Sequence, residues 1–321
     1  MPGQKRLKTA KHDKSFSTVN YEDAINGGGE GANSVSNAAA DPDDLRGDLR
    51  GEPRGELRGD LRGDLRGDLR GEPRGDLRFP ARRAPLLTTV PELDATVICC
   101  RACPRLVEWR EETGRVKRKA FREWDYWARP VPGFGPSDAA LAVIGLAPAA
   151  HGGNRTGRIF TGDPSGDVLY AALHAIGLAS QPGSSHRGDG LTLHGVRITV
   201  PVHCAPPQNR PTTAERDTCR PWLARELQLL RPSLRAVVVL GGFAWQALMP
   251  VLSAAGWQLP RPRPAFGHGT EMRLAAGEEG RRELYVLGCY HPSQRNVSTK
   301  TVTPAMIRDI LRRGAGLAGL L

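Results

Sequence analysis

Short apolar segments alternate with amphipathic stretches through the second half of the chain. Four runs rich in β-branched residues predict buried strands: Leu141–Leu146, Val196–His203, Leu234–Leu240 and Leu284–Tyr290. Helical periodicity marks Gly166–Leu178, Ala214–Leu230 and Phe243–Ala255 between them, with a last helix near Pro304–Arg313. Apolar strands that alternate with helices are typical of a mainly parallel sheet covered on both faces. We therefore expect an α/β fold, a three-layer α/β/α arrangement around a four-stranded sheet.

Two further helices are expected before the sheet. The pattern places them at Cys99–Glu112 and Val116–Trp127, joined near Gly114. The second carries Trp124, Tyr126 and Trp127 among lysines and arginines.

The N-terminal quarter has a different composition. Residues 45–78 repeat a Leu-Arg-Gly-Asp tetrapeptide in which Pro sometimes replaces Leu and Glu sometimes replaces Asp. One Leu per unit cannot build a core, and Gly at this density makes ordering entropically costly. We expect residues 1–84 to form a disordered tail and residues 85–321 to form one domain.

The chain is basic, and the excess charge lies after the tail. Its 321 residues contain 45 Lys+Arg and 34 Asp+Glu, a formal net charge of +11, while residues 1–84 hold 16 basic and 15 acidic side chains. Such a field suits a polyanionic partner such as nucleic acid. No apolar run is long enough to span a bilayer, and no secretory signal is readable. A cytoplasmic protein is expected, associated with the nucleoid if the source is bacterial.

Four of the six cysteines form two pairs with metal-ligand spacing. Cys100 and Cys103 make a C-x-x-C pair at the start of a helix, whereas Cys204 ends a strand and Cys219 lies in the next helix. Thiolates so arranged bind zinc or an iron–sulfur cluster, and the residues alone leave both open. Of the other two, Cys99 is interpreted as a bystander next to the first pair and Cys289 as a core residue of its strand.

Polar, glycine-rich or proline-rich segments follow three of the predicted strands: Gly145–Asp163, Ala205–Pro211 and His291–Lys300. In open α/β sheets, ligands bind beyond the carboxyl ends of the strands. We therefore expect these segments to meet at one edge of the sheet and to form the site.

Four motifs together resemble the iron–sulfur uracil-DNA glycosylases, most closely family 5, the type b enzymes. They are Cys100-x-x-Cys103, the segment from Gly145 to Asp163, Cys204-Ala-Pro-Pro-Gln-Asn209-Arg-Pro-Thr, and His291-Pro-Ser-Gln-Arg-Asn296. The resemblance covers about residues 93 to 313. It implies a DNA repair enzyme that flips a deaminated base out of DNA and hydrolyses its N-glycosidic bond. It also implies a structural 4Fe–4S cluster on Cys100, Cys103, Cys204 and Cys219.

Three residues match the chemistry of such a hydrolysis. A carboxylate must orient water and offset charge on an oxocarbenium-like sugar, and a donor must stabilise the departing base. The resemblance assigns Asp163 as the carboxylate, Asn209 as its partner in holding water, and His291 as the donor. From pattern alone, Asp163 could equally cap the following helix, Asn209 could be a turn residue, and His291 could bond structurally.

The base pocket is expected to contain Gly145, Leu146, His151, Phe160 and Val200. Phe160 would stack on the flipped base, and His151 would be a secondary catalytic group. Leu146 stands where many relatives carry a polar or acidic residue, and Val200 where relatives strict for uracil carry Asn. A site that does not read the pyrimidine edge rejects wrong bases poorly. We therefore expect activity on uracil, hypoxanthine, xanthine and modified pyrimidines, and expect Val200→Asn to narrow it.

Contacts with DNA are expected from Arg155 and Arg158 among glycines, and from the last motif. The latter set comprises Ser293, Gln294, Arg295, Asn296 and Lys300. The alternative is that the charged members are solvated loop residues. DNA is the expected partner, with no membrane and no obligate protein partner. Two rival functions remain from the residues: a non-catalytic iron–sulfur DNA-binding protein, and a zinc-stabilised α/β hydrolase of a small molecule.

Overall fold

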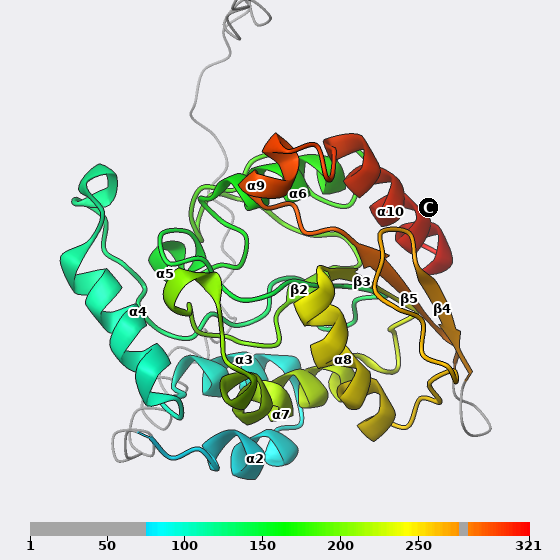
Figure 1. Cartoon of the computed structure of the whole chain (residues 1–321), viewed down its shortest axis with the longest axis horizontal. Coiled ribbons are helices and arrows are strands. Elements are labelled where there is room, and N and C mark those ends of the chain that lie inside the picture. Colours follow the sequence, from blue (N-terminus) through cyan, green and yellow to red (C-terminus); the bar gives the residue numbers. More distant parts are fainter. Residues whose placement is uncertain (1–74, 276–281) are drawn as a thin grey trace, which may run out of the picture. The chain divides into compact units, whose positions relative to one another are not determined.

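The computed structural model describes residues 75–275 and 282–321 (Figure 1). In chain order its helices and strands are α2 (Phe79–Arg83), α3 (Val90–Ile98), α4 (Pro104–Val116), β1 (Leu141–Ile144), α5 (Gly153–Thr156), α6 (Pro164–His174), β2 (Val196–Thr199), α7 (Thr213–Leu230), β3 (Ala236–Leu240), α8 (Gly242–Ala254), β4 (Glu271–Leu274), β5 (Leu284–Cys289), α9 (Gln294–Ser298) and α10 (Pro304–Leu317). None of these helices combines the length and apolar composition needed to cross a lipid bilayer.

The strands form one sheet in the order β2-β1-β3-β5-β4. The first four are parallel neighbours, with Leu141 of β1 beside Val196 of β2 and Ala236 of β3. All four predicted strands are therefore present. The fifth strand, β4, pairs antiparallel with β5 and was not predicted. It is a short edge strand whose Glu271 and Arg273 are exposed while the alternate residues are buried, so it lacks a continuous apolar run.

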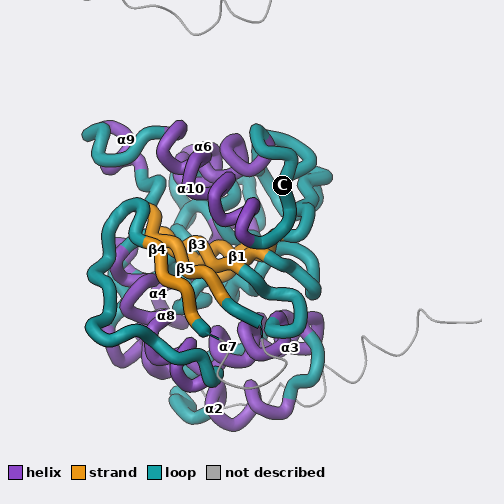
Figure 2. Tube along the Cα trace, turned by 90° about the vertical axis from the view of Figure 1, so that its right-hand side faces the viewer, coloured by secondary structure: helices purple, strands orange, loops and turns teal. Residues whose placement is uncertain are grey.

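Successive residues of each strand point to opposite faces of the sheet, and helices cover both. Leu141 and Val143 pack in one core with residues of α6 and α10, and Ala142 and Ile144 pack in a second core with α7 and α8. Figure 2 shows the strands between these two helical layers. The three-layer α/β/α architecture is confirmed. The carboxyl ends of β1, β2 and β5 lie at one edge, because these strands run parallel.

The predicted helix Val116–Trp127 is wrong. Helix α4 ends at Val116, because Lys117 adopts a left-handed conformation (φ 55°) that breaks the helical path. Only a single 3₁₀ turn, Lys119–Phe121, follows it. The preceding helix starts at Pro104 rather than Cys99, since residues 99–103 connect α3 to α4.

The folded domain begins earlier than the predicted residue 85. Helix α2 buries Phe79, whose ring meets Trp222 of α7 edge-on at 5.9 Å between centroids. The apolar residues of the segment after the repeat thus complete a small core with α3 and α7. Residues 1–74, which hold nearly all of the predicted disordered tail, lie outside the described residues.

Candidate functional site

The loop after β1 holds Phe160 in a conformation that few large residues adopt. Its φ is +53°, and its ring lies against Gly145, where a Cβ would approach the ring to 2.7 Å. A Cβ on Gly166 would lie 1.8 Å from the Phe160 carbonyl oxygen. The hydroxyl of Tyr170 donates to the carbonyl of Ile159 at 2.9 Å. Two close approaches by glycine and one buried hydrogen bond therefore fix the direction of this ring.

Asp163 caps α6, as the pattern alone allowed. Its Oδ1 accepts hydrogen bonds from the backbone N–H groups of Ser165 (3.0 Å) and Gly166 (3.1 Å). Its Oδ2 accepts none from the described residues, so capping occupies only one carboxylate oxygen. Burial raises the pKa of Asp163 above its ordinary value, and the two backbone N–H groups only partly oppose this.

His291 follows β5 and is held by its backbone rather than by its ring. The amide of Asn296 donates to the carbonyl oxygen of His291 at 2.9 Å, while the imidazole lies 5.8 Å from the Phe160 ring between centroids. Burial lowers the pKa of His291 to about 4, so the imidazole is uncharged at neutral pH. An uncharged imidazole carries one N–H, which can donate a hydrogen bond to an oxygen of a bound molecule.

Asn209 ends the 3₁₀ turn Pro207–Asn209, which follows β2. Its φ is +55°, and Asn is one of the few residues that take this conformation readily. The residue is exposed, so its amide is available to a ligand.

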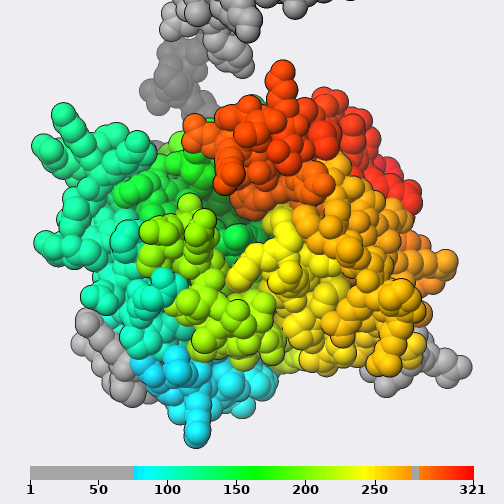
Figure 3. Space-filling view, viewed as in Figure 1, coloured from blue at the N-terminus to red at the C-terminus, as the bar shows by residue number. Residues whose placement is uncertain are grey.

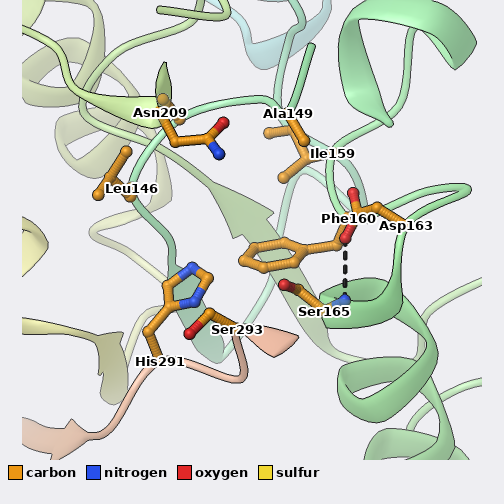
Figure 4. Close-up of a pocket in the computed structure, with 10 residues that line it drawn as sticks. Leu146, Ala149, Ile159, Phe160, Asp163, Ser165, Asn209, His291 and Ser293 are labelled. Carbon is orange, nitrogen blue, oxygen red and sulfur yellow. Dashed lines mark hydrogen bonds between the residues drawn. The ribbon is translucent and has the colours of Figure 1, made fainter. Parts of the chain in front are cut away.

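These residues surround one cavity of about 310 Å³. Figure 4 shows Phe160 in the middle of the group, with His291 and Asn209 on one side and Asp163 on the other. The lining residues are Leu146, Ala147, Ala149, Ile159, Phe160, Asp163, Ser165, Asn209, His291 and Ser293. Three separate loops therefore meet as expected. Sequence reasoning missed Ala147, Ala149, Ile159 and Ser165, of which only Ser165 carries a polar signal, in the first turn of α6.

Three residues predicted for the base pocket do not line this cavity. Gly145 and Val200 lie behind the Phe160 ring, and Val200 is fully buried in the core. His151 points elsewhere, with its Nδ1 3.0 Å from the hydroxyl of Tyr126. Partial burial and the positive charges of Arg118 and Arg155 lower the pKa of His151. None of the three lines the cavity, and their contact with a bound base stays a prediction.

The two arginines predicted to meet phosphates are internal, and that prediction is also wrong. Arg158 is 4% exposed and forms a bidentate pair with Asp189 at 2.9 and 2.6 Å. Arg155 is also 4% exposed, and it donates to the carbonyls of His151 (2.7 Å) and Gly162 (3.0 Å). Both guanidinium groups hold the loop that carries Phe160 and Asp163.

Among the residues predicted from the last motif, one lines the cavity. Ser293 lines the cavity and caps α9, accepting from the backbone N–H of Asn296 at 3.3 Å. Gln294, Arg295 and Lys300 are exposed. Their contact with DNA stays a prediction.

Comparison with known proteins identifies the family. The Uracil DNA glycosylase superfamily model matches residues 132–313. A type-5 uracil-DNA glycosylase of Mycobacterium bovis is 53% identical over 232 residues, which cover 72% of this chain and 83% of that protein. The chain belongs to the type-5 uracil-DNA glycosylases. A second type-5 enzyme, from Thermus thermophilus, is 47% identical over 70% of this chain and 96% of its own.

The predicted family and the predicted enzymatic class are thereby confirmed. Similarity to the type-4 enzymes is lower: one from Pyrobaculum aerophilum is 34% identical over 40% of this chain and 57% of its own.

The glycosylase brings its four paired cysteines together away from the cavity of Asp163. Cys100, Cys103, Cys204 and Cys219 line one small cavity between α2, α4, the segment after β2 and α7. Burial and mutual repulsion raise the pKa of Cys100 to about 11 and that of Cys103 to about 12. Among the described residues, no group of three or more His, Cys, Asp and Glu side chains is arranged to hold a single metal ion. Cys289 is buried in the core, as expected.

Replacing Gly145 by Ala tests the support of the Phe160 ring. The new Cβ would lie 2.7 Å from the ring, so the ring must move into the cavity. We expect kcat/KM for uracil excision to fall roughly 10- to 100-fold with the melting temperature little changed. Gly316→Ala is the matched control, because no atom lies within 4 Å of its Cβ position. Full activity of Gly145→Ala would contradict the assignment.

Proposed function

We propose that this glycosylase removes uracil from DNA by hydrolysing the N-glycosidic bond, leaving an abasic site for base excision repair. One observation carries the proposal: a carboxylate, an amide, an uncharged imidazole and an aromatic ring from three loops line one cavity. Its volume, about 310 Å³, lies at the lower end of the range of small-molecule sites, and an extruded base is a ligand of that class.

The base is held first. An extruded base enters the cavity and stacks on Phe160, whose ring packs against the backbone of Gly145. His291 then presents its N–H to a carbonyl oxygen of the base. As the glycosidic bond breaks, its electron pair moves into the base, and this N–H stabilises the negative charge on that oxygen. An N–H aimed in advance costs little reorganisation, which is why a buried neutral imidazole suits the role.

The water is held on the sugar side. Asp163 accepts one water proton while the amide of Asn209 orients the oxygen toward the anomeric carbon. The bond from this oxygen to the sugar forms as the base departs, and the carboxylate offsets the positive charge on the sugar. Oδ2 of Asp163 is the oxygen available for this role, because Oδ1 already accepts two backbone hydrogen bonds.

The substrate range extends beyond uracil in this proposal, to hypoxanthine, xanthine and modified pyrimidines. Five of the ten lining residues have no side-chain hydrogen-bonding group: Leu146, Ala147, Ala149, Ile159 and Phe160. A base that lacks the uracil edge therefore leaves no buried polar group unpaired, and the site has little means to reject it.

A structural 4Fe–4S cluster on Cys100, Cys103, Cys204 and Cys219 completes the proposal. The donor set fits, because each of three thiols has an N–H beside it that favours the thiolate form. Arg110 donates to Sγ of Cys204 at 2.9 Å, and the backbone N–H groups of Ala102 and His203 face Cys100 and Cys219. When bound, the cluster would crosslink α4 to α7 and supply no step of the hydrolysis.

Asp163→Asn tests the carboxylate. Asn still caps a helix, so folding is retained, but it cannot take a proton from water; kcat should fall roughly 10²–10⁴-fold. In the native enzyme Asp163 acts in its ionised form, and burial raises its pKa. As the pH is lowered, activity should therefore begin to decline at a higher pH than for an ordinary Asp, whose pKa is near 3.8. His291, with its pKa at about 4, should add no inflection near pH 6.5.

The control for this experiment is Asp167→Asn, which removes an exposed carboxylate from the same helix turn outside the cavity. Its activity should match the wild type. Full cleavage by Asp163→Asn would show that another residue is the general base. A wild type that binds uracil-DNA without cleaving it would favour the non-catalytic function.

Duplexes that contain uracil, hypoxanthine or xanthine at one position test the substrate range. Abasic sites revealed by alkali give kcat/KM for each. A cavity that excludes bases by shape alone should discriminate by no more than roughly 200-fold. Discrimination of about 10⁴ or more would show that a polar group reads the edge of uracil, and the broad range would be wrong.

Metal content tests the cluster. Purified protein should be brown and contain about four iron and about four acid-labile sulfide per chain. Cys219→Ala should lose the visible absorbance and most of the iron, whereas Cys99→Ala, at the leftover neighbouring cysteine, should keep both. A colourless protein with one zinc per chain would overturn the proposal.

A further inference from the structure

The segment Lys117–Arg129, named here the ledge, presents the positive charge that Arg155 and Arg158 do not. It contains five basic residues, two acidic residues and four aromatic residues. Arg118, Lys119, Arg122 and Arg129 are exposed. Within the described part of the chain, none of these four forms an ion pair, whereas Arg115 just before the ledge pairs with Glu112 at 2.6 Å. These four cations of the ledge therefore have no ion-pair partner among the described residues, and they lie where the sequence pattern predicted a helix.

Aromatic packing holds the ledge in one position. The guanidinium of the buried Arg155 lies between the rings of Phe121 and Trp124, at 4.0 and 4.1 Å from their centroids. The hydroxyl of Tyr126 meets Nδ1 of His151 at 3.0 Å. A surface fixed in this way loses little conformational entropy when it binds a partner, because its backbone is already ordered.

The ledge packs against the segment that also lines the cavity of Asp163. Its contacts, His151 and Arg155, belong to the same loop as Ala149 and Asp163, which line the cavity. On another side of the cavity, Ser293 leads into α9 with the exposed Arg295 and Lys300. Figure 1 shows α5 between the segment after α4 and α9. Figure 3 shows the segment after α4 standing out at the left, on the face that also presents the orange-red residues of α9.

We propose that the ledge is a DNA-binding surface, whose cations contact the phosphates of the strand beside the extruded nucleotide. The inference rests on the proposed function. A strand whose nucleotide enters the cavity must continue past its rim, and Arg118, Lys119 and Arg122 are exposed on the segment that packs against His151 and Arg155. Phosphate contacts set the register of DNA on a protein without reading its sequence. The ledge would thus hold one flank of the damaged site while α9 holds the other.

The triple variant Arg118→Ala, Lys119→Ala, Arg122→Ala in the full chain tests this surface. Each lost phosphate contact lowers the salt dependence of binding, so the slope of log K against log salt should fall by about 3 in magnitude. The Kd for a uracil-containing duplex should rise roughly 10- to 100-fold near physiological salt. At saturating DNA, the single-turnover rate should change little, because none of the three residues lines the cavity.

A matched control removes three exposed arginines elsewhere: Arg261→Ala, Arg263→Ala, Arg312→Ala. It lowers the net charge equally, but it changes the segment after α8 and helix α10, which Figure 1 places away from the ledge. Equal Kd and salt slope for the two triple variants would overturn the inference and reduce the ledge to general charge. Failure of the proposed function is distinguishable, since the wild type itself would then not cleave uracil-DNA.

Discussion

The Phe160 ring packs against the backbone of Gly145, which has no side chain, and the arrangement of the site depends on this contact. Gly145 leaves the space for the ring, and Gly166 leaves it for the carbonyl of the same residue. The left-handed backbone at Phe160 costs of order 1–3 kcal/mol, which the surrounding core must offset. That conformation turns the ring toward His291 and lets the chain return to cap α6 with Asp163. Stacking surface and carboxylate are therefore positioned by one local constraint.

Buried arginines link the separate parts of the molecule. Arg155 ties the ledge to the loop of Asp163, and Arg158 ties the same loop to Asp189. Arg110 donates to Cys204, while its own carbonyl accepts from the amide of Asn154 in α5 at 3.2 Å. Helix α4 therefore contacts both the cysteine cavity and helix α5, which lies in the segment that leads to Phe160. Four arginines of the described domain are buried: Arg110, Arg155, Arg158 and Arg197.

Sequence patterns could predict the strands and the residues that follow them, because the carboxyl ends of parallel strands must share an edge. Asp163, Asn209 and His291 were found by that rule together with the family motifs. Arg158 could not be placed correctly, since its partner Asp189 is 31 residues away and nothing local distinguishes a buried arginine from a solvated one. The segment after Val116 has the pattern of a helix, but its aromatic residues pack on Arg155 instead.

The charge state of His291 determines whether the base departs as an anion or as a neutral molecule. Because burial keeps the ring neutral above a pH of about 4, it can share a proton with the base but cannot hand one over as a strong acid would. On the proposed mechanism the base departs as an anion, and its own acidity governs how readily the bond breaks. Among bases that fit equally well, rates would follow leaving-group acidity. The order of substrates would then be a property of their chemistry more than of the shape of the cavity.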